Sequence, residues 1–228
     1  MELFQFKNSD KLFFIYPHPD DETIFNAGLF QYLNKNKIDY KVLILTKGEA
    51  STLKRKLGKS NLKTKRQLEF YNSMKVLKVK NYEITDFEDG GLSRESELPK
   101  YLNEKIEAYK PTYILTFEPN GLYGHTDHVF LSQLLTELAH TKNIKIIYTT
   151  IPNTYRLDKG ALNMSILNPL PNHLEANFIL KLSLLELLNK IKAFYMYRSQ
   201  FSFKKELLFR PFNFLEIRKE YYTLKDDN

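Results

Sequence analysis

The chain has 228 residues, of which 43% are hydrophobic and 14% aromatic, and this is enough to build the core of one α/β domain. It contains no cysteine, which excludes disulfides, cysteine-ligated zinc and thiol catalysis and leaves histidine, aspartate and glutamate as strong metal ligands. The net charge is +7, but acids are interspersed among the lysines, and no apolar run is long enough for a signal peptide or a membrane span. We therefore expect a cytoplasmic protein without a nucleic-acid partner.

Strand and helix signals alternate over the first 150 residues. Hydrophobic periodicity first predicts a strand, a helix, a second strand and a long helix, over Leu12–Tyr16, Thr23–Asn34, Tyr40–Thr46 and Asn61–Leu77. Next come a short strand, a turn-rich segment, a helix and a strand, over Tyr82–Ile84, Asp86–Leu92, Glu97–Tyr109 and Thr112–Phe117. The series ends with a polar loop, a helix with an apolar stripe and a strand, over Glu118–His125, Val129–Leu138 and Ile144–Thr150.

This alternation indicates an α/β fold with a mostly parallel sheet that helices cover on both faces. From Ile151 on the pattern is looser, and only Asn177–Tyr197 is predicted as helix. We expect one domain over residues 1–228, with a core over about 1–150 and a less regular C-terminal extension over about 151–228 that packs on the core.

Two clusters of histidines and carboxylates follow strands of the predicted sheet. The sequence PHPDDE (Pro17–Glu22) comes directly after the first strand, and GHTDH (Gly124–His128) follows the strand Thr112–Phe117. A solvated turn or a pair of helix caps would account for one or two of these side chains, but not for all of them. Ligands of open parallel sheets bind beyond the carboxyl ends of the strands, so the clusters form one site if these two strands are neighbours.

The spacing within each cluster suits a shared cation. His18 and Asp21 are three residues apart, as are His125 and His128, and on the first turn of a helix such residues project to one side. A catalytic zinc takes three nitrogen or oxygen ligands from the protein and leaves a position for water, which it makes more acidic. A further carboxylate can then accept a proton from that water, a histidine can stabilise an oxyanion or protonate the leaving amine, and Asp127 is placed to orient an imidazole.

The two motifs resemble the signature of the PIG-L (LmbE-like) family of zinc-dependent N-acetylglucosaminyl de-N-acetylases, whose usual motifs read A-H-P-D-D-E and H-x-D-H. The resemblance covers about the first two-thirds of the chain and extends to Thr46–Glu49, Arg66, Glu69, Asp89-Gly90 and Lys110-Pro111. It implies a Rossmann-like three-layer α/β sandwich. It also implies an amidohydrolase that removes an acetyl group from an N-acetylglucosamine-type sugar, in a small molecule or a glycoconjugate.

The resemblance assigns roles to single residues. It implies three ligands for Zn²⁺ or another divalent transition metal, namely His18, Asp21 and His128. It implies that Asp20 is the general base and that His125, supported by Asp127, stabilises the oxyanion or acts as an acid. Glu22 would cap the following helix or fix the loop.

Three residues outside the motifs are candidates for contacts with substrate. Arg66 and Glu49 lie where the family has similar residues, although an exposed ion pair of Arg66 with Glu69 within one helix is an alternative. Tyr197 precedes an R-S-Q triplet at a place where the family more often has a histidine. A tyrosine hydroxyl can donate a hydrogen bond to an oxyanion but cannot become a cation near neutral pH.

Other polar segments have weaker signals. The basic cluster Lys54–Arg66 is interpreted as a solvated loop and helix face, with attraction of an acidic or phosphorylated substrate as the alternative. Asp89-Gly90-Gly91 is predicted as a turn from its composition.

Other classes of protein stay open. A Rossmann-type nucleotide or cofactor binder, such as a methyltransferase, would have a glycine-rich turn after the first strand, where this chain has PHPDD. A non-catalytic sugar-binding member of the same fold would keep the pocket without turnover. A hydrolase of another amide would share the metal site and the base.

Overall fold

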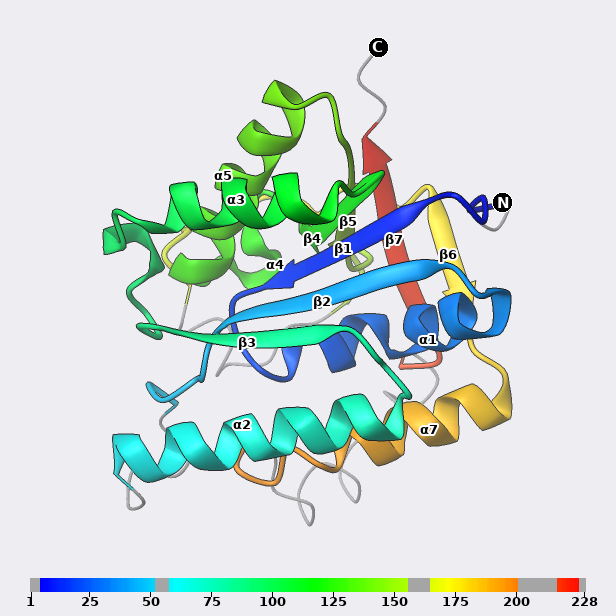
Figure 1. Cartoon of the computed structure of the whole chain (residues 1–228), viewed down its shortest axis with the longest axis horizontal. Helices are drawn as coiled ribbons and strands as arrows, with labels where there is room; N and C mark the ends of the chain where they lie inside the picture. The colour runs from blue at the N-terminus through cyan, green and yellow to red at the C-terminus, as the bar shows by residue number, and fades with distance from the viewer. Residues whose placement is uncertain (1–4, 52–57, 156–164, 201–216, 226–228) are drawn as a thin grey trace.

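The structure is a computed structural model that describes residues 5–51, 58–155, 165–200 and 217–225. These residues form a seven-stranded sheet with the order β3-β2-β1-β4-β5-β7-β6 (Figure 1). The strands are β1 (Lys11–Tyr16), β2 (Asp39–Thr46), β3 (Tyr82–Phe87), β4 (Tyr113–Phe117), β5 (Lys145–Thr150), β6 (Phe178–Lys181) and β7 (Lys219–Lys225). The helices are α1 (Asp21–Asn36), α2 (Lys59–Val76), η2 (Leu92–Arg94), α3 (Leu98–Tyr109), α4 (Gly121–Gly124), α5 (Thr126–Thr141) and α7 (Leu184–Phe194). The strands from β3 to β5 run parallel, which confirms the predicted α/β fold with a mostly parallel sheet.

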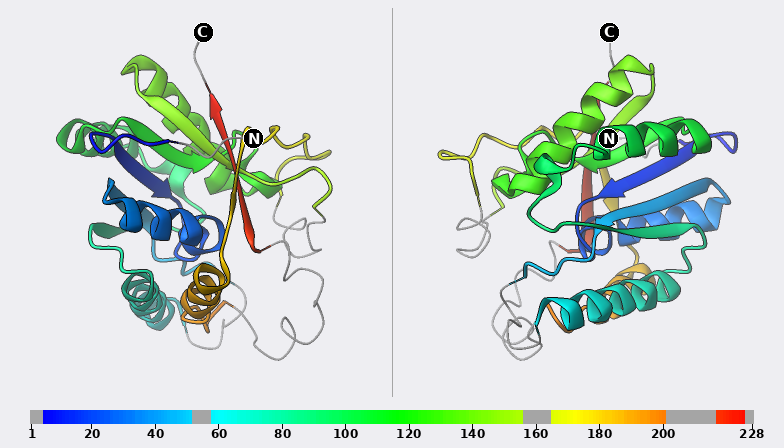
Figure 2. Two further views of the ribbon diagram at one scale, coloured as in Figure 1. Left: turned by 90° about the vertical axis from the view of Figure 1, so that its right-hand side faces the viewer. Right: turned by 60° about the vertical axis from the view of Figure 1, so that its left-hand side comes forward.

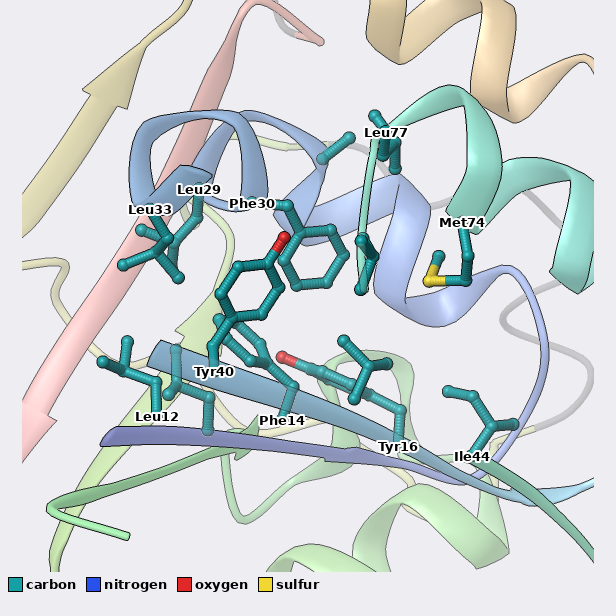
Figure 3. Close-up of a cluster of buried hydrophobic side chains, with 14 of the residues drawn as sticks. Leu12, Phe14, Tyr16, Leu29, Phe30, Leu33, Tyr40, Ile44, Met74 and Leu77 are labelled. Carbon is teal, nitrogen blue, oxygen red and sulfur yellow. The ribbon is translucent and has the colours of Figure 1, made fainter. Parts of the chain in front are cut away.

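Helices cover both faces of the sheet. Figures 1 and 2 show α1, α2 and α7 on one side of it and α3 and α5 on the other. Successive side chains of β1 point into opposite cores: Leu12, Phe14 and Tyr16 pack on the side of α1 (Figure 3), whereas Phe13 and Ile15 pack on the side of α3 and α5. Because both faces are buried, β1 has a continuous apolar sequence instead of an alternating one.

The C-terminal extension differs from the predicted helix over Asn177–Tyr197. Phe178–Lys181 forms β6, and α7 begins only at Leu184. Ser183 and Glu186 form a capping box that fixes this start. The short apolar sequence of β6 is compatible with helix or strand, and its antiparallel pairing with β7 decides between them.

Two further strands and one helical turn differ from the prediction. β7 has no counterpart among the predicted elements; it pairs antiparallel with β5 and brings the extension into the sheet. β3 continues to Phe87, three residues past its predicted end at Ile84, and pairs with β2. The predicted polar loop Glu118–His125 contains the short helix α4. We propose that residues 1–228 form a single domain, because strands from both sides of residue 150 belong to the same sheet.

Glu83 on β3 connects its strand to β2 and α3. Its carboxylate accepts hydrogen bonds from Lys41 at 2.9 Å, from Lys105 at 2.5 Å and from the Tyr101 hydroxyl at 2.9 Å. Partial burial would raise the pKa of Glu83, but hydrogen bonds from the two ammonium groups outweigh it and lower the pKa from its ordinary value of 4.5 to about 2. The folded chain therefore favours the ionised carboxylate.

We expect Glu83→Gln to lower the free energy of unfolding by about 1 kcal/mol at pH 7, a value that allows for solvent screening at this partly exposed site. Since the folded pKa is depressed, the stabilisation is complete above the unfolded pKa and is lost as the pH falls through the folded pKa. Urea unfolding at pH 7 and pH 3 measures the difference, with Glu104→Gln, exposed on α3, as the control. An equally large effect of Glu83→Gln at both pH values would contradict this account.

Candidate active site

The two sequence motifs meet at the carboxyl edge of the sheet because β1 and β4 are parallel neighbours. The segment Pro17–Glu22 follows β1, and the loop after β4 turns at Asn120, whose side chain accepts a backbone hydrogen bond, before entering α5 at His125. Gly121 has a φ of 66°, and a β-carbon at this position would lie 2.7 Å from the His128 β-carbon. The loop therefore needs glycine here to bring His128 to the site.

Three buried side chains place one ligand atom each around a common point. His18 Nδ1 lies 3.2 Å from His128 Nε2 and 3.4 Å from Asp21 Oδ2, and the last two atoms are 3.5 Å apart. A tetrahedral ion with bonds of about 2.0–2.1 Å needs ligand atoms roughly 3.3–3.4 Å from one another. The backbone N–H of His18 donates to the same Asp21 oxygen at 3.0 Å and fixes it. These three atoms thus have the spacing and the chemical type of a divalent-metal site.

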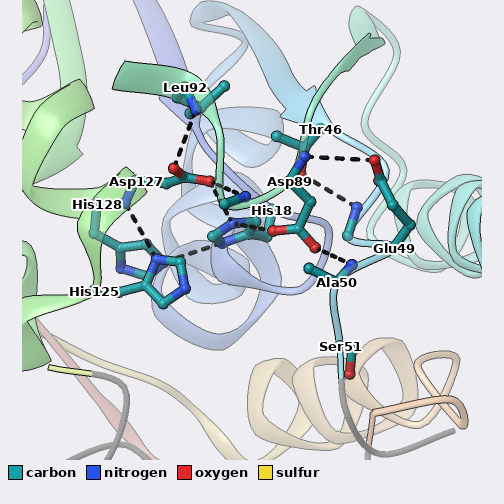
Figure 4. Close-up of polar contacts among 12 residues, drawn as sticks. His18, Thr46, Glu49, Ala50, Ser51, Asp89, Leu92, His125, Asp127 and His128 are labelled. Atoms are coloured by element: carbon teal, nitrogen blue, oxygen red, sulfur yellow. Dashed lines mark hydrogen bonds and ion pairs between the residues drawn. The ribbon is translucent and has the colours of Figure 1, made fainter. Parts of the chain in front are cut away.

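The other nitrogen of His18 faces two aspartates (Figure 4). His18 Nε2 is 3.0 Å from Asp89 Oδ1 and 3.3 Å from Asp127 Oδ2. Burial would lower the pKa of His18, but these carboxylates and Asp21 outweigh it and hold the pKa well above its ordinary value. A carboxylate behind a metal-binding imidazole fixes its tautomer and its orientation. The side chain of Asp127 thus contacts His18, and its predicted support of His125 stays a prediction.

Asp127 is itself held by the turn after β3. Its carboxylate accepts the backbone N–H groups of Gly90 at 2.8 Å and Leu92 at 3.2 Å (Figure 4). The described residues contain two groups that could each hold a metal ion, His18 with His125 and His128, and His18 with Asp89 and Asp127. Within each group, the ligand atoms all lie within 4.8 Å of one another. His18 is common to both groups and to the triangle with Asp21, so it lies at the centre of the site.

Asp20 is next to this centre and partly accessible, with 15% of its side chain exposed. Its carboxylate lies 3.2 Å from Arg66 Nη2. Burial raises the pKa of Asp20 to about 8, more than the nearby Arg66 guanidinium lowers it. A carboxylate with a raised pKa is a stronger base than an ordinary one, which suits the predicted role of Asp20 in proton transfer.

Arg66 is only 4% exposed and contacts the loops of the site, instead of lying on a solvated helix face. It donates to the carbonyl oxygens of Gly48, at 2.8 Å, and Pro19. Gly48 has a φ of 68°, and the Arg66 guanidinium passes through the space that a β-carbon would occupy. The alternative of an exposed ion pair with Glu69 is wrong, since Glu69 is buried as well. Lys54–Lys56 of the basic cluster lie outside the described residues.

Glu49 and Tyr197, the other two candidates for substrate contacts, are also buried. Glu49 Oε1 accepts the backbone N–H of Asp89 at 3.4 Å and lies 3.3 Å from the Lys63 ammonium. The Tyr197 hydroxyl donates to Glu22 at 2.5 Å. Both side chains therefore contact other residues of the protein in buried positions, and their contact with substrate stays a prediction.

His125 has the geometry of a neutral hydrogen-bond donor. It is the N-cap of α5, and its Nδ1 accepts the backbone N–H of Asp127 at 3.3 Å. Burial lowers the pKa of His125, and the neighbouring His18 lowers it further. With Nδ1 acting as an acceptor, the proton of the neutral ring is on Nε2. The ring lies 4.9 Å from that of His18 and 5.0 Å from that of His128, measured between centroids.

Two residues of the site were not identified from the sequence. Asp89 was predicted as part of a turn from its composition and noted as a further point of resemblance to the family, without a role in the site. Because β3 ends at Phe87 and not at Ile84, Asp89 follows a strand at the same edge as the two motifs. Tyr123 directly precedes GHTDH, and its hydroxyl lies 3.4 Å from His128 Nε2. Burial raises the pKa of Tyr123 well above its ordinary value, so the hydroxyl stays protonated and can donate.

A mostly parallel sheet with histidines and aspartates gathered at its carboxyl edge defines an α/β protein with a His/Asp centre. Residues 13–139 match the family described as PIG-L, GlcNAc-PI de-N-acetylase, and the chain belongs to this family, which confirms the resemblance of its motifs.

Individual relatives agree with this assignment. Diacetylchitobiose deacetylase of Thermococcus kodakarensis is 32% identical over 124 residues, which are 54% of this chain and 46% of that protein. The chain thus spans about half the length of this curated relative. The solved structure of N,N'-diacetylchitobiose deacetylase from Pyrococcus horikoshii has a TM-score of 0.71 and 23% identity, over 95% of this chain and 84% of the other. That of the zinc inhibited form of teicoplanin deacetylase Orf2 has a TM-score of 0.67 and 15% identity, over 96% and 100%. Both structures have the same fold.

Proposed function

We propose that this protein is a zinc-dependent hydrolase that removes the N-acetyl group from an N-acetylglucosamine-type sugar conjugate. The observation that carries the proposal is the triangle of His18 Nδ1, Asp21 Oδ2 and His128 Nε2, next to the partly exposed carboxylate of Asp20. Membership of the PIG-L family and similarity to the diacetylchitobiose deacetylase of Thermococcus kodakarensis support the choice of an acetylated amino sugar.

The triangle fits zinc because all three atoms are acceptors of the type that zinc binds in catalytic sites, two imidazole nitrogens and one carboxylate oxygen. His18, Asp21 and His128 would hold the ion. When bound, zinc acts as a Lewis acid toward the amide carbonyl and makes water more acidic. Two imidazole nitrogens facing each other at 3.2 Å beside a carboxylate also form a site that favours positive charge.

The remaining polar groups of the site supply proton transfer and hydrogen bonds. Asp20 takes a proton from the attacking water, while Arg66 fixes the position of its carboxylate. His125 donates from Nε2, and Tyr123 from its hydroxyl, to the carbonyl oxygen as negative charge develops on it. The carbon–nitrogen bond then breaks, and the proton held by Asp20 passes to the departing amine, leaving acetate and the free amino sugar.

Acetate release by the purified, zinc-loaded protein tests the proposal directly. Suitable substrates are N,N'-diacetylchitobiose and N-acetylglucosaminyl conjugates of inositol, with loss of one acetyl group read by mass spectrometry. We expect turnover of at least one substrate, loss of turnover on chelation of the metal and recovery on addition of zinc. A protein that binds zinc and folds normally but releases no acetate from any of these substrates would exclude this function.

We expect Asp89→Asn to weaken zinc binding about 10- to 100-fold without abolishing it, since it removes one of the two carboxylates behind His18. Titration of the apoprotein with zinc measures the dissociation constant. Asp86→Asn is the control. It changes an exposed aspartate on β3, the strand that precedes the turn with Asp89. Complete loss of binding would instead indicate that the ion is held by His18, Asp89 and Asp127.

The proposed partner is a small sugar conjugate or a glycoconjugate. The absence of a nucleic-acid partner and the cytoplasmic location stay predictions from composition. Within the described ranges, none of the helices combines the length and the apolar character required to span a bilayer.

A further inference from the structure

Asp20 has a backbone conformation that residues with a β-carbon rarely adopt. Its φ is 110° and its ψ is −33°, outside the regions favoured by L-residues. Such a conformation is strained and persists only where surrounding contacts impose it. The contacts around Asp20 therefore determine where its carboxylate lies.

Glu22 and Arg66 supply these contacts. Glu22 Oε2 accepts the backbone N–H of Asp20 at 3.0 Å. Arg66 donates to the Asp20 carboxylate, at 3.2 Å, and to the carbonyl oxygen of Pro19, which precedes it. Glu22 and Arg66 thus both hold the peptide before Asp20, and Arg66 also holds the side chain of Asp20.

Glu22 is fully buried and depends on two hydroxyl groups for its own position. The Tyr197 hydroxyl and the Thr23 hydroxyl both donate to Glu22 Oε1 at 2.5 Å. Thr23 belongs to the same turn of α1 as Glu22, whereas Tyr197 comes from the C-terminal extension, 175 residues away along the chain. Tyr197 therefore ties this carboxylate to the C-terminal extension.

The segment that carries Tyr197 is attached to α2 two residues later. Ser199 donates its backbone N–H, at 2.9 Å, and its hydroxyl, at 2.5 Å, to the buried carboxylate of Glu69. Gln200 accepts a hydrogen bond from Ser51 at 2.8 Å. Ser199 and Gln200 lie beyond residues 13–139, which match the PIG-L family. The extension thus reaches the back of the active site at a defined position.

We propose that Tyr197 is a positioning residue for the reaction, and that it fixes the Asp20 carboxylate through Glu22. This rests on the proposed function, in which Asp20 is the base. Tyr197 is fully buried, so it acts through Glu22 and not by contact with the substrate. A carboxylate displaced by about 1 Å from its productive position lowers turnover about 100-fold.

Tyr197→Phe tests the proposal by removing one oxygen atom. We expect kcat for acetate release to fall roughly 10- to 100-fold, with KM within about twofold of the wild type and unchanged zinc content. Hydrogen exchange of the peptide around Asp20, followed by mass spectrometry, should be about tenfold faster. Tyr222→Phe is the matched control, because Tyr222 is also buried and donates to a buried glutamate, Glu220, at 2.9 Å. It should leave kcat and exchange near Asp20 unchanged.

Glu22→Gln provides a second variant on the same connection. We expect it to lower kcat at least as much as Tyr197→Phe, and the double variant to lose little more than Glu22→Gln alone, because both changes act on one path to Asp20. Wild-type kcat and exchange in Tyr197→Phe, or equal losses in Tyr222→Phe, would overturn the proposal. If the wild-type protein released no acetate, the proposed function would fail, while the exchange measurement would still decide whether Tyr197 fixes the Asp20 segment.

Discussion

Replacing Asp20 with asparagine is expected to lower the rate of acetate release by about 10²–10⁴-fold while the fold and the zinc content stay unchanged. Asparagine has nearly the same shape and keeps an oxygen that can accept a hydrogen bond from Arg66, but it cannot take a proton from water. Asp20 is adjacent to Asp21 in sequence, but it supplies no atom to the triangle of proposed zinc ligands. The loss should therefore fall on kcat, and zinc affinity should be little affected.

The measurement compares kcat, KM and zinc content of Asp20→Asn with those of Asp10→Asn. Asp10 is a buried aspartate at the opposite end of β1, where it accepts the backbone N–H of Lys7 at 2.8 Å. It is therefore a matched control for the loss of a buried carboxylate far from the site. Asp20→Asn with a rate close to that of the wild type would show that another group accepts the proton.

His128→Ala is expected to weaken zinc binding by more than about 100-fold, because it removes one of the three proposed ligand atoms. Loss of a residue that only supports a ligand already lowers metal affinity about 10- to 100-fold. Binding to the folded state stabilises it, so zinc should raise the melting temperature of the wild type but not that of the variant. His140→Ala, which changes an exposed histidine at the other end of α5, should behave as the wild type.

The His128 variant also separates the possible groups of ligands. His128 belongs to the triangle and to the group with His18 and His125, but not to the group of His18, Asp89 and Asp127. Zinc binding that survives in His128→Ala and is lost in Asp89→Asn would place the ion at His18 Nε2, with Asp89 and Asp127 as the other ligands. Together the two variants assign the ion to one side of this imidazole.

Much of the fold could be predicted because the strands and helices of the first 150 residues have strong local patterns. The continuous apolar sequence of β1 and the spacing of apolar residues in α5 depend on neighbouring positions in the chain. The two errors in the extension concern short elements. β7 is a strand because it pairs with β5, and β6 because it pairs with β7; pairing partners far apart in sequence leave no local signal.

Only some residues of the candidate site could be predicted from the sequence. PHPDDE and GHTDH were found because each holds several polar groups at a strand end. Asp89 was given no role because its composition indicated only a turn, although it was noted among the matches to the family. Tyr123 was missed because a single tyrosine in a loop has no distinctive pattern. Arg66, Glu49 and Tyr197 were found but expected at the surface of the pocket. Their burial follows from the packing of segments that are distant in sequence, which spacing along the chain does not reveal.

The amino-acid sequence by itself determined which chemical groups are available at the strand ends and how those three residues apart are oriented, because these properties depend only on residue type and local backbone geometry. The tertiary structure alone decided that β1 lies beside β4, so that His18 and His128, 110 residues apart, face each other at 3.2 Å. It also decided that Asp127 contacts His18 and that Tyr197 reaches Glu22. These contacts arise from the packing of distant segments, whose free energy depends on the whole fold and not on any single stretch of sequence.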